Sequence, residues 1–126
     1  MIRGIGVDLC SIDRIRRFIR KRSFRERVFS EEECRYAQEK ADPARHFASA
    51  FAAKEAFAKA GGWGLGTVGL QGVAVTRTEG RPYLRVAPTV QELLRHRGVD
   101  SVHLSLSHDG LYAIAVVVLE GRSDDA

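Results

Sequence analysis

The segment PARHFASAFAAKEAFAKA, residues 43–60, is the longest helix that the sequence predicts, and the other elements are expected to pack around it. Asp42 stands at the N-cap, with proline at the first helical position, and Gly61-Gly62 ends the pattern. Phe47, Phe51 and Ala58 recur at helical spacing on one face. Alanine fills most other positions and favours helix.

Shorter elements are predicted on both sides of this helix. A capping-box pair, Ser30 and Glu33, precedes a helix over 31–39, and either Ser11 or Asp13 caps an earlier one. A further helix begins at Pro88. Strands are predicted over residues 2–9, 72–77, 82–86, 102–107 and 112–119. The order favours a single α+β domain over residues 1–120, with a mainly antiparallel sheet packed on a long central helix and a polar tail over 121–126.

The composition is that of an ordinary globular domain. The chain has 126 residues, of which 44% are apolar and 29% charged. No segment approaches the roughly 20 apolar residues that a membrane span needs, and the N-terminus does not resemble a signal peptide. The two cysteines, Cys10 and Cys34, have no metal-binding spacing and are expected to be free thiols in a reducing cytoplasm.

Positive charge is concentrated near the N-terminus. The net charge is +4, and residues 14–27 hold a single acid, Glu26. Such a block predicts an acidic partner, which nucleic acid, anionic lipid or an acidic protein would each satisfy. The basic residues of the block are Arg14, Arg16, Arg17, Arg20, Lys21, Arg22, Arg25 and Arg27.

Two carboxylates are candidates for chemistry, although local sequence alone does not favour a functional role for either. Asp8 ends a strand just before a helix, where it can act as a cap or simply lie near a helix N-terminus. Glu55 lies in the middle of the long helix, where Lys59 can form an ordinary pair with it one turn later. The alternative is that both carboxylates bind a metal while the lysine contacts phosphate.

The glycine-rich segment and the histidines give weaker signals. Residues 61–69 (GGWGLGTVG) follow a helix instead of preceding one, so they do not form a P-loop. His103 and His108 flank the segment LSLS near the end of the strand predicted over 102–107, and no matching cysteines suggest zinc. A structural role is expected for His103, and a more exposed position at a turn for His108.

Several blocks, in order, resemble the short holo-acyl-carrier-protein synthases of the 4′-phosphopantetheinyl transferase family. GIGVDLCSIDRI (4–15) is similar to the family pattern GxGxDxxxxxRI, and FAAKEAFAKA (51–60) to FAxKEAxxKA. The final block, from His103 to His108, resembles the family's HxSxxH. GLGTVGLQGVAV and EGRPYLRV resemble the loop and hairpin between them. The set covers nearly the whole chain, which makes it specific.

The resemblance implies an enzyme that transfers the 4′-phosphopantetheine group of coenzyme A to a serine of an acyl carrier protein. Mg²⁺ is the implied cofactor, with coenzyme A as a substrate. Mg²⁺ commonly binds one or two carboxylates together with substrate phosphates. The implied metal ligands are Asp8 and Glu55, which with Lys59 are also the implied catalytic residues, and the implied coenzyme A contacts are Lys59, Gly62, Gly64 and His108.

The resemblance also implies two kinds of protein contact, and neither nucleic acid nor a membrane as a partner. An acidic carrier protein is expected on the basic first helix, through Arg14, Phe18, Arg22 and Phe24. A homotrimer with active sites between subunits is expected as well. Residues 116–119 (VVVL) are apolar on both faces of a strand, so a neighbouring chain can cover one of them, although a helix of the same chain would also do so.

Two positions depart from the family pattern. Ala50 stands where relatives usually carry an arginine, and Trp63 lies in a loop that usually reads FGTG. Trp63 can stack on adenine or pack at an interface. Two other functions are therefore kept: a small basic nucleic-acid-binding module, suggested by the arginines, and a non-catalytic coenzyme A binder, suggested by Ala50. The general base stays open among His108, a metal-bound water and a carboxylate.

Overall fold

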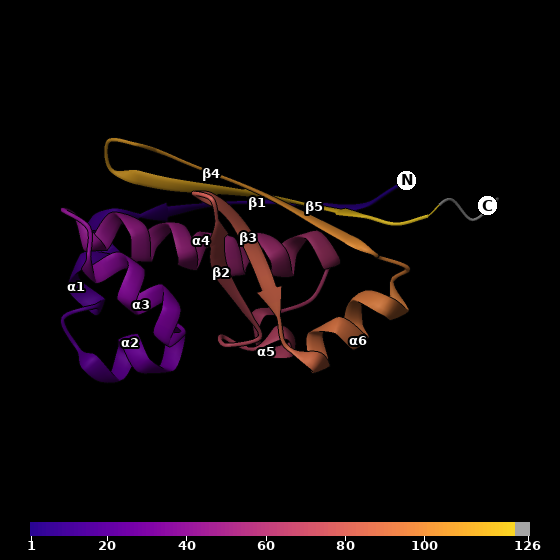
Figure 1. The fold of residues 1–126 in the computed structure, drawn as a ribbon, viewed down its shortest axis with the longest axis horizontal. Helices are drawn as coiled ribbons and strands as arrows, with labels where there is room; N and C mark the ends of the chain where they lie inside the picture. Colours follow the sequence, from indigo (N-terminus) through magenta and orange to yellow (C-terminus); the bar gives the residue numbers. More distant parts are fainter. Residues whose placement is uncertain (123–126) are drawn as a thin grey trace.

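The computed structural model describes residues 1–122, in which three strands form one antiparallel sheet against a long helix. The strands are β1 (Ile2–Ser11), β5 (Tyr112–Glu120) and β4 (Ser101–Asp109), in that order across the sheet. The helix is α4 (Pro43–Gly61). Figure 1 shows the sheet along one side of the molecule and the helices on the other, so one face of the sheet is covered and the other is open.

Glycines in β1 allow the strand to lie directly on α4. A Cβ atom at Gly4 would lie 1.9 Å from the carbonyl oxygen of Ala60, and one at Gly6 would lie 2.0 Å from that of Ala56. A larger side chain would therefore separate the strand from the helix. Because side chains alternate along a strand, Asp8 points to the same side as these glycines and is brought against α4.

The central strand β5 divides its side chains between the two faces of the sheet. Ala113, Ala115, Val117 and Leu119 are buried on the α4 side. The intervening residues, among them Val116 and Val118, are half-buried on the open side. The prediction that both faces of this strand are apolar is confirmed, and α4 covers only one of them.

Three short helices pack at the N-terminal end of α4. They are α1 (Ile12–Phe18), α2 (Arg22–Val28) and α3 (Glu31–Gln38). Ser11, not Asp13, caps α1, because its hydroxyl accepts a hydrogen bond from the Arg14 amide at 3.2 Å. The predicted capping box of α3 is confirmed, with both reciprocal bonds between Ser30 and Glu33 present.

The start of α4 differs in one detail from the sequence prediction. Pro43 occupies the first turn, as predicted, but the Asp42 side chain makes no capping bond. It accepts a hydrogen bond from Arg16 at 2.8 Å instead. This ion pair joins α1 to the beginning of α4 and lowers the pKa of the Asp42 carboxyl.

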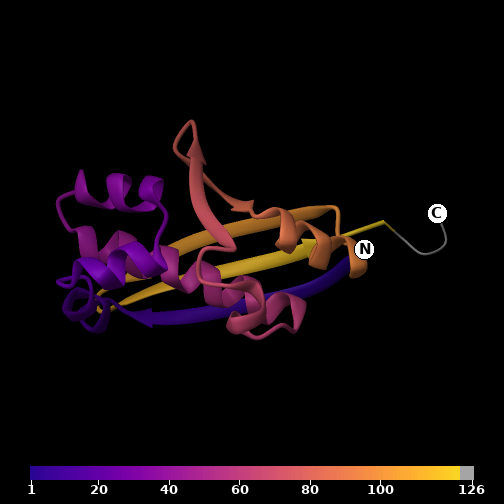
Figure 2. The ribbon, with the colours of Figure 1, turned by 90° about the horizontal axis from the view of Figure 1, so that it is seen from below.

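The remaining elements form a hairpin and two helices. The hairpin pairs β2 (Val73–Thr78) with β3 (Arg81–Val86), and it stands out from the body between the N-terminal helices and α6 (Pro88–His96) in Figure 2. The glycine-rich segment, predicted as a loop, contains the short helix α5 (Leu65–Val68). The predicted α+β class, with antiparallel strands and a long helix, is confirmed.

The chain ends are close together in the described part of the structure. Gly121 is buried, and its amide donates to the carbonyl oxygen of Met1 at 3.0 Å, so this first residue of the predicted tail is held by the domain. The rest of that prediction, from residue 123 onward, falls outside the described residues. Within residues 1–122, every helix is too short or too polar to cross a membrane.

Candidate active site

The predicted metal ligands lie together in one cavity. Asp8 from β1, Glu55 and Lys59 from α4, and Arg14 from α1 line a hollow of about 440 Å³. The sheet, the long helix and the first two helices meet here, so the site depends on the tertiary fold. The other lining residues are Leu9, Cys10, Ser11, Ile15, Phe18, Phe24 and Phe51.

Lys59 joins the two elements that carry the carboxylates. Its ammonium group donates to Asp8 Oδ1 at 3.0 Å and to the carbonyl oxygen of Val7 at 3.3 Å. The alternative that Lys59 merely pairs with Glu55 along the helix is therefore not the arrangement found. Asp8 is also not a helix cap, since it lies inside β1 opposite Ala115.

The two carboxylates make the cavity locally negative. Partial burial raises the pKa of Glu55, and the charge of Asp8 raises it further, while Lys59 opposes both. Burial, with Asp8 as the next cause, raises the pKa of the Cys10 thiol to about 11. A raised pKa disfavours the thiolate, so Cys10 is a poor candidate for a nucleophile.

This donor set fits Mg²⁺ better than a transition metal. In residues 1–122, no group of three or more His, Cys, Asp and Glu side chains is placed to bind a metal ion. A zinc site needs such a group, whereas Mg²⁺ commonly binds one or two carboxylates and completes its shell with water and phosphate oxygens. A divalent cation between Asp8 and Glu55 would also relieve the repulsion that raises the Glu55 pKa.

An apolar rim borders the cavity on the side of the N-terminal helices. Phe18 is 44% exposed and stacks on Phe24, with 5.3 Å between the ring centroids. The guanidinium of Arg14 lies 6.0 Å from the centre of the Phe18 ring. A positive charge and exposed aromatic surface therefore adjoin the two carboxylates.

Of the four residues predicted to contact coenzyme A, Lys59 lines this cavity, and the other three lie outside it. Gly62 caps α4 with a φ of 72°, and Gly64 precedes α5. His108 is exposed near the tip of the β4–β5 hairpin. These three residues lie on other parts of the chain's surface, and their role in binding coenzyme A stays a prediction.

Trp63 packs within the chain. Its ring centroid lies 5.5 Å from that of Phe57, and the guanidinium of Arg97 lies 5.5 Å from its ring. Ala50, where the family pattern has arginine, is only 6% exposed. Trp63 therefore has partners within its own chain, and the two alternatives for it, stacking on adenine and packing at an interface, both stay predictions.

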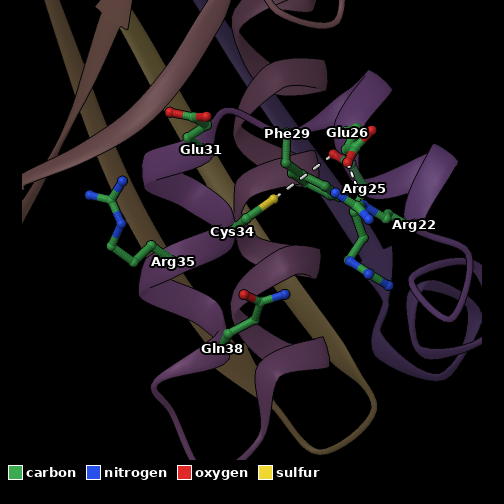
Figure 3. Close-up of a pocket in the computed structure, with 8 residues that line it drawn as sticks. All are labelled: Arg22, Arg25, Glu26, Phe29, Glu31, Cys34, Arg35 and Gln38. Carbon is green, nitrogen blue, oxygen red and sulfur yellow. Dashed lines mark hydrogen bonds and ion pairs between the residues drawn. The ribbon is translucent and has the colours of Figure 1, made fainter.

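A larger hollow, of about 580 Å³, lies between α2 and α3 (Figure 3). Figure 3 shows Arg22 and Arg25 on one side and Arg35 on the other, with Cys34 between them. Arg22, predicted to bind the carrier, lies here and pairs with Glu26 at 2.6 Å. The structure thus separates Arg22 from the cavity that Arg14, Phe18 and Phe24 line.

One buried charged residue was missed in the sequence prediction. Lys54 is fully buried and pairs with Glu33. Position 54 falls on the helix face marked by Phe47, Phe51 and Ala58, because spacings of three and four residues share a face. Had that pattern been extended to every residue, it would have predicted a lysine directed into the core.

The comparison with known families agrees with this geometry. The model of the 4′-phosphopantetheinyl transferase superfamily matches residues 4–117. The chain therefore belongs to this superfamily, as the sequence motifs predicted, and it is an enzyme of that class.

Among its relatives, the holo-[acyl-carrier-protein] synthase of Syntrophus aciditrophicus is 43% identical over 98% of this chain and 100% of its own length. That of Syntrophotalea carbinolica is 48% identical over 94% of this chain and 96% of its own. The synthase structure from Neisseria meningitidis superposes with a TM-score of 0.87 at 35% identity, covering 95% of this chain and 99% of that one. The Bacillus anthracis synthase in complex with CoA (3′,5′-ADP) gives 0.80 at 33% identity, with coverages of 97% and 99%.

Proposed function

We propose that this chain transfers the 4′-phosphopantetheine group of coenzyme A to a serine hydroxyl of an apo-acyl carrier protein, with Mg²⁺ as cofactor. The second product is adenosine 3′,5′-bisphosphate. The observation that carries the proposal is the meeting of Asp8, Glu55 and Lys59 in one cavity, in a chain closely similar to holo-[acyl-carrier-protein] synthases.

Three polar residues of the cavity and its apolar rim have a part in this reaction. Asp8 and Glu55 would hold Mg²⁺, which neutralises the pyrophosphate and the departing bisphosphate when bound. Lys59 is 56% exposed, so its ammonium group can turn from Asp8 toward a phosphate oxygen. The apolar rim adjoins the carboxylates, where a docked carrier would bring its serine.

Release of adenosine 3′,5′-bisphosphate tests this function directly. The chain is incubated with coenzyme A, Mg²⁺ and apo-carrier protein, and the nucleotide products are separated by chromatography. Release should require the carrier and should stop when EDTA removes the metal. Coenzyme A that binds but is never cleaved would identify a non-catalytic binder, and release without carrier would identify a hydrolase.

Arg14 is proposed to dock the acidic carrier protein. It lies beside the exposed Phe18 ring at the edge of the cavity, where a carrier presenting its serine must approach. Arg14→Glu should raise the KM for carrier protein by about tenfold, equivalent to about 1.4 kcal/mol, because attraction becomes repulsion. The KM for coenzyme A should change much less. Added salt should reduce the difference in carrier KM between the wild type and Arg14→Glu.

Arg81→Glu is the matched control, since Arg81 is equally charged but lies on the distant hairpin. Equal carrier KM values for the Arg14 and Arg81 variants would contradict docking on α1.

A homotrimer is proposed because the open face of the sheet is apolar. Ile5 and Val7 of β1 are 65% and 54% exposed, and they lie opposite Val118 and Val116 of β5. Leu9 continues the row at 56% exposure. A continuous apolar face of this kind is typical of a surface that another chain covers. A neighbouring subunit there can also bring further residues to the coenzyme A site.

Ile5→Lys should convert the trimer to a monomer, because it places a charge in the centre of this face. Light scattering should show the mass fall to that of one chain, with loss of activity if the site is shared. Tyr83→Lys is the control, since Tyr83 is 43% exposed but lies on the hairpin. A wild-type protein that is monomeric and fully active would refute both the trimer and the shared site.

The proposed compartment is the cytoplasm. Cys10 and Cys34 are both free thiols in the structure. Free thiols are ordinary in a reducing compartment, where disulfides are rare.

A further inference from the structure

A buried charged pair, Glu33 and Lys54, includes the residue that precedes Glu55 in α4. The Lys54 side chain is 0% exposed and that of Glu33 is 2% exposed, and Lys54 Nζ donates to Glu33 Oε1 at 3.1 Å. Charges are seldom buried this completely, and they require partners when they are. Nothing in the proposed reaction uses either residue directly.

Hydrogen bonds from three elements meet at this pair. Lys54 Nζ also donates to the carbonyl oxygen of Val73 at 2.6 Å. Glu33 Oε2 accepts from the Val75 amide at 2.8 Å, and Glu33 Oε1 accepts from the Ser30 amide at 2.9 Å. The pair therefore fixes α4 against both α3 and β2 at a single point.

That point is next to Glu55 in the helix. Successive residues of an α-helix are about 100° apart around its axis, so Lys54 and Glu55 project in different directions from the same turn. A rotation or sliding of α4 that moved Lys54 would move the Glu55 carboxylate as well. On the opposite side of this turn, Ala56 packs against Gly6 of β1, which fixes the depth of the strand that carries Asp8.

Stability alone is a weak explanation for the pair. Buried ion pairs can often be replaced by apolar side chains of similar volume without loss of stability. Their directional bonds, in contrast, specify one arrangement of the packed elements.

We infer that the Glu33–Lys54 pair is a positioning device that sets the place of Glu55 relative to Asp8, and so the affinity of the site for its divalent cation. This inference rests on the proposed function. Groups that hydrogen-bond directly to metal ligands change metal affinity or activity by about 10–100-fold when they are removed. The pair acts through the helix instead, so an effect at the lower end of this range is expected.

The test uses the full chain and Mn²⁺ as a spectroscopic probe in the presence of coenzyme A. The double variant Glu33→Gln/Lys54→Met removes both charges and so leaves no unpaired buried ion. Its Mn²⁺ dissociation constant, from electron paramagnetic resonance, should rise by about tenfold or more. The Mg²⁺ concentration for half-maximal transfer should rise in parallel, while the KM for carrier protein stays near that of the wild type.

Two further variants separate positioning from general destabilisation. Glu33→Asp keeps the charge but shortens the side chain, so it should weaken Mn²⁺ binding in the same direction, and it decides the question if the double variant does not fold. Leu94→Ala removes buried volume near the end of α6 and should lower the melting temperature without changing Mn²⁺ affinity.

A folded pair variant with wild-type Mn²⁺ affinity would overturn the inference, even if its melting temperature fell. So would a Leu94→Ala variant that weakened Mn²⁺ binding as strongly. A wild-type protein that transfers no phosphopantetheine but binds Mn²⁺ would instead refute the proposed function, so the two failures are distinguishable.

Discussion

Replacing Asp8 with asparagine, or Glu55 with glutamine, should lower kcat/KM for transfer by at least about 100-fold. An amide of the same shape lacks the charge with which the carboxylate would hold Mg²⁺, so the phosphate charge is no longer neutralised during transfer. The fold should persist, because both side chains line a cavity instead of filling the core. The measurement is initial rate at saturating coenzyme A over a range of Mg²⁺ concentrations.

The substitution Glu55→Gln should lower activity without lowering stability. Partial burial and, after it, the charge of Asp8 raise the pKa of Glu55 against the opposing effect of Lys59, so the ionised form is disfavoured in the folded protein. Glu55→Gln should therefore leave the melting temperature unchanged or raise it. Glu79→Gln is the control for charge loss alone, since Glu79 is exposed at the hairpin turn. Either site variant retaining near-normal activity at high Mg²⁺ would show that the metal assignment is wrong.

Lys54→Met should reduce the free energy of unfolding by about 3–5 kcal/mol, the usual effect of removing one partner of a buried ion pair. The substitution leaves Glu33 buried with its amide hydrogen bonds but without its counter-charge, and leaves the Val73 carbonyl without the ammonium donor. That loss is a large fraction of the stability of a small domain. Urea titration at one fixed protein concentration measures it, since association would make stability depend on concentration.

The double variant Glu33→Gln/Lys54→Met should recover much of this loss, because no unpaired charge remains in the core. The difference between the single and double variants reports the interaction between the two residues. A single variant as stable as the wild type would mean that Lys54 is not held in the core as the structure shows.

The main elements could be predicted from the sequence where periodicity and terminal signals agreed. α4 and α3 are examples, since proline, glycine and the Ser30–Glu33 capping box mark their ends. α2 was not predicted as a helix, because it has only seven residues and no side-chain cap. Helices this short depend on packing more than on their own propensity. α5, with four residues inside a glycine-rich segment, was missed for the same reason.

The site was predictable through motif resemblance but not from local spacing. Asp8 and Lys59 are 51 residues apart, and their contact depends on β1 lying against α4 at Gly4 and Gly6. Locally, Asp8 resembled a cap and Lys59 a partner of Glu55. Lys54 illustrates the reverse case, because it falls on the face that Phe47, Phe51 and Ala58 mark, and the helical spacing was not extended to it.

The mass of the carrier protein after reaction is the most direct test of the central claim, that the Asp8–Glu55 cavity is a phosphopantetheine-transfer site. Apo-carrier protein is incubated with coenzyme A, Mg²⁺ and either the wild-type chain, Asp8→Asn or Glu79→Gln, and intact masses are recorded. The account predicts a gain of one phosphopantetheine group with the wild type and Glu79→Gln, and none with Asp8→Asn over the same time. An unmodified carrier with the wild-type chain, or equal modification by Asp8→Asn, would contradict it.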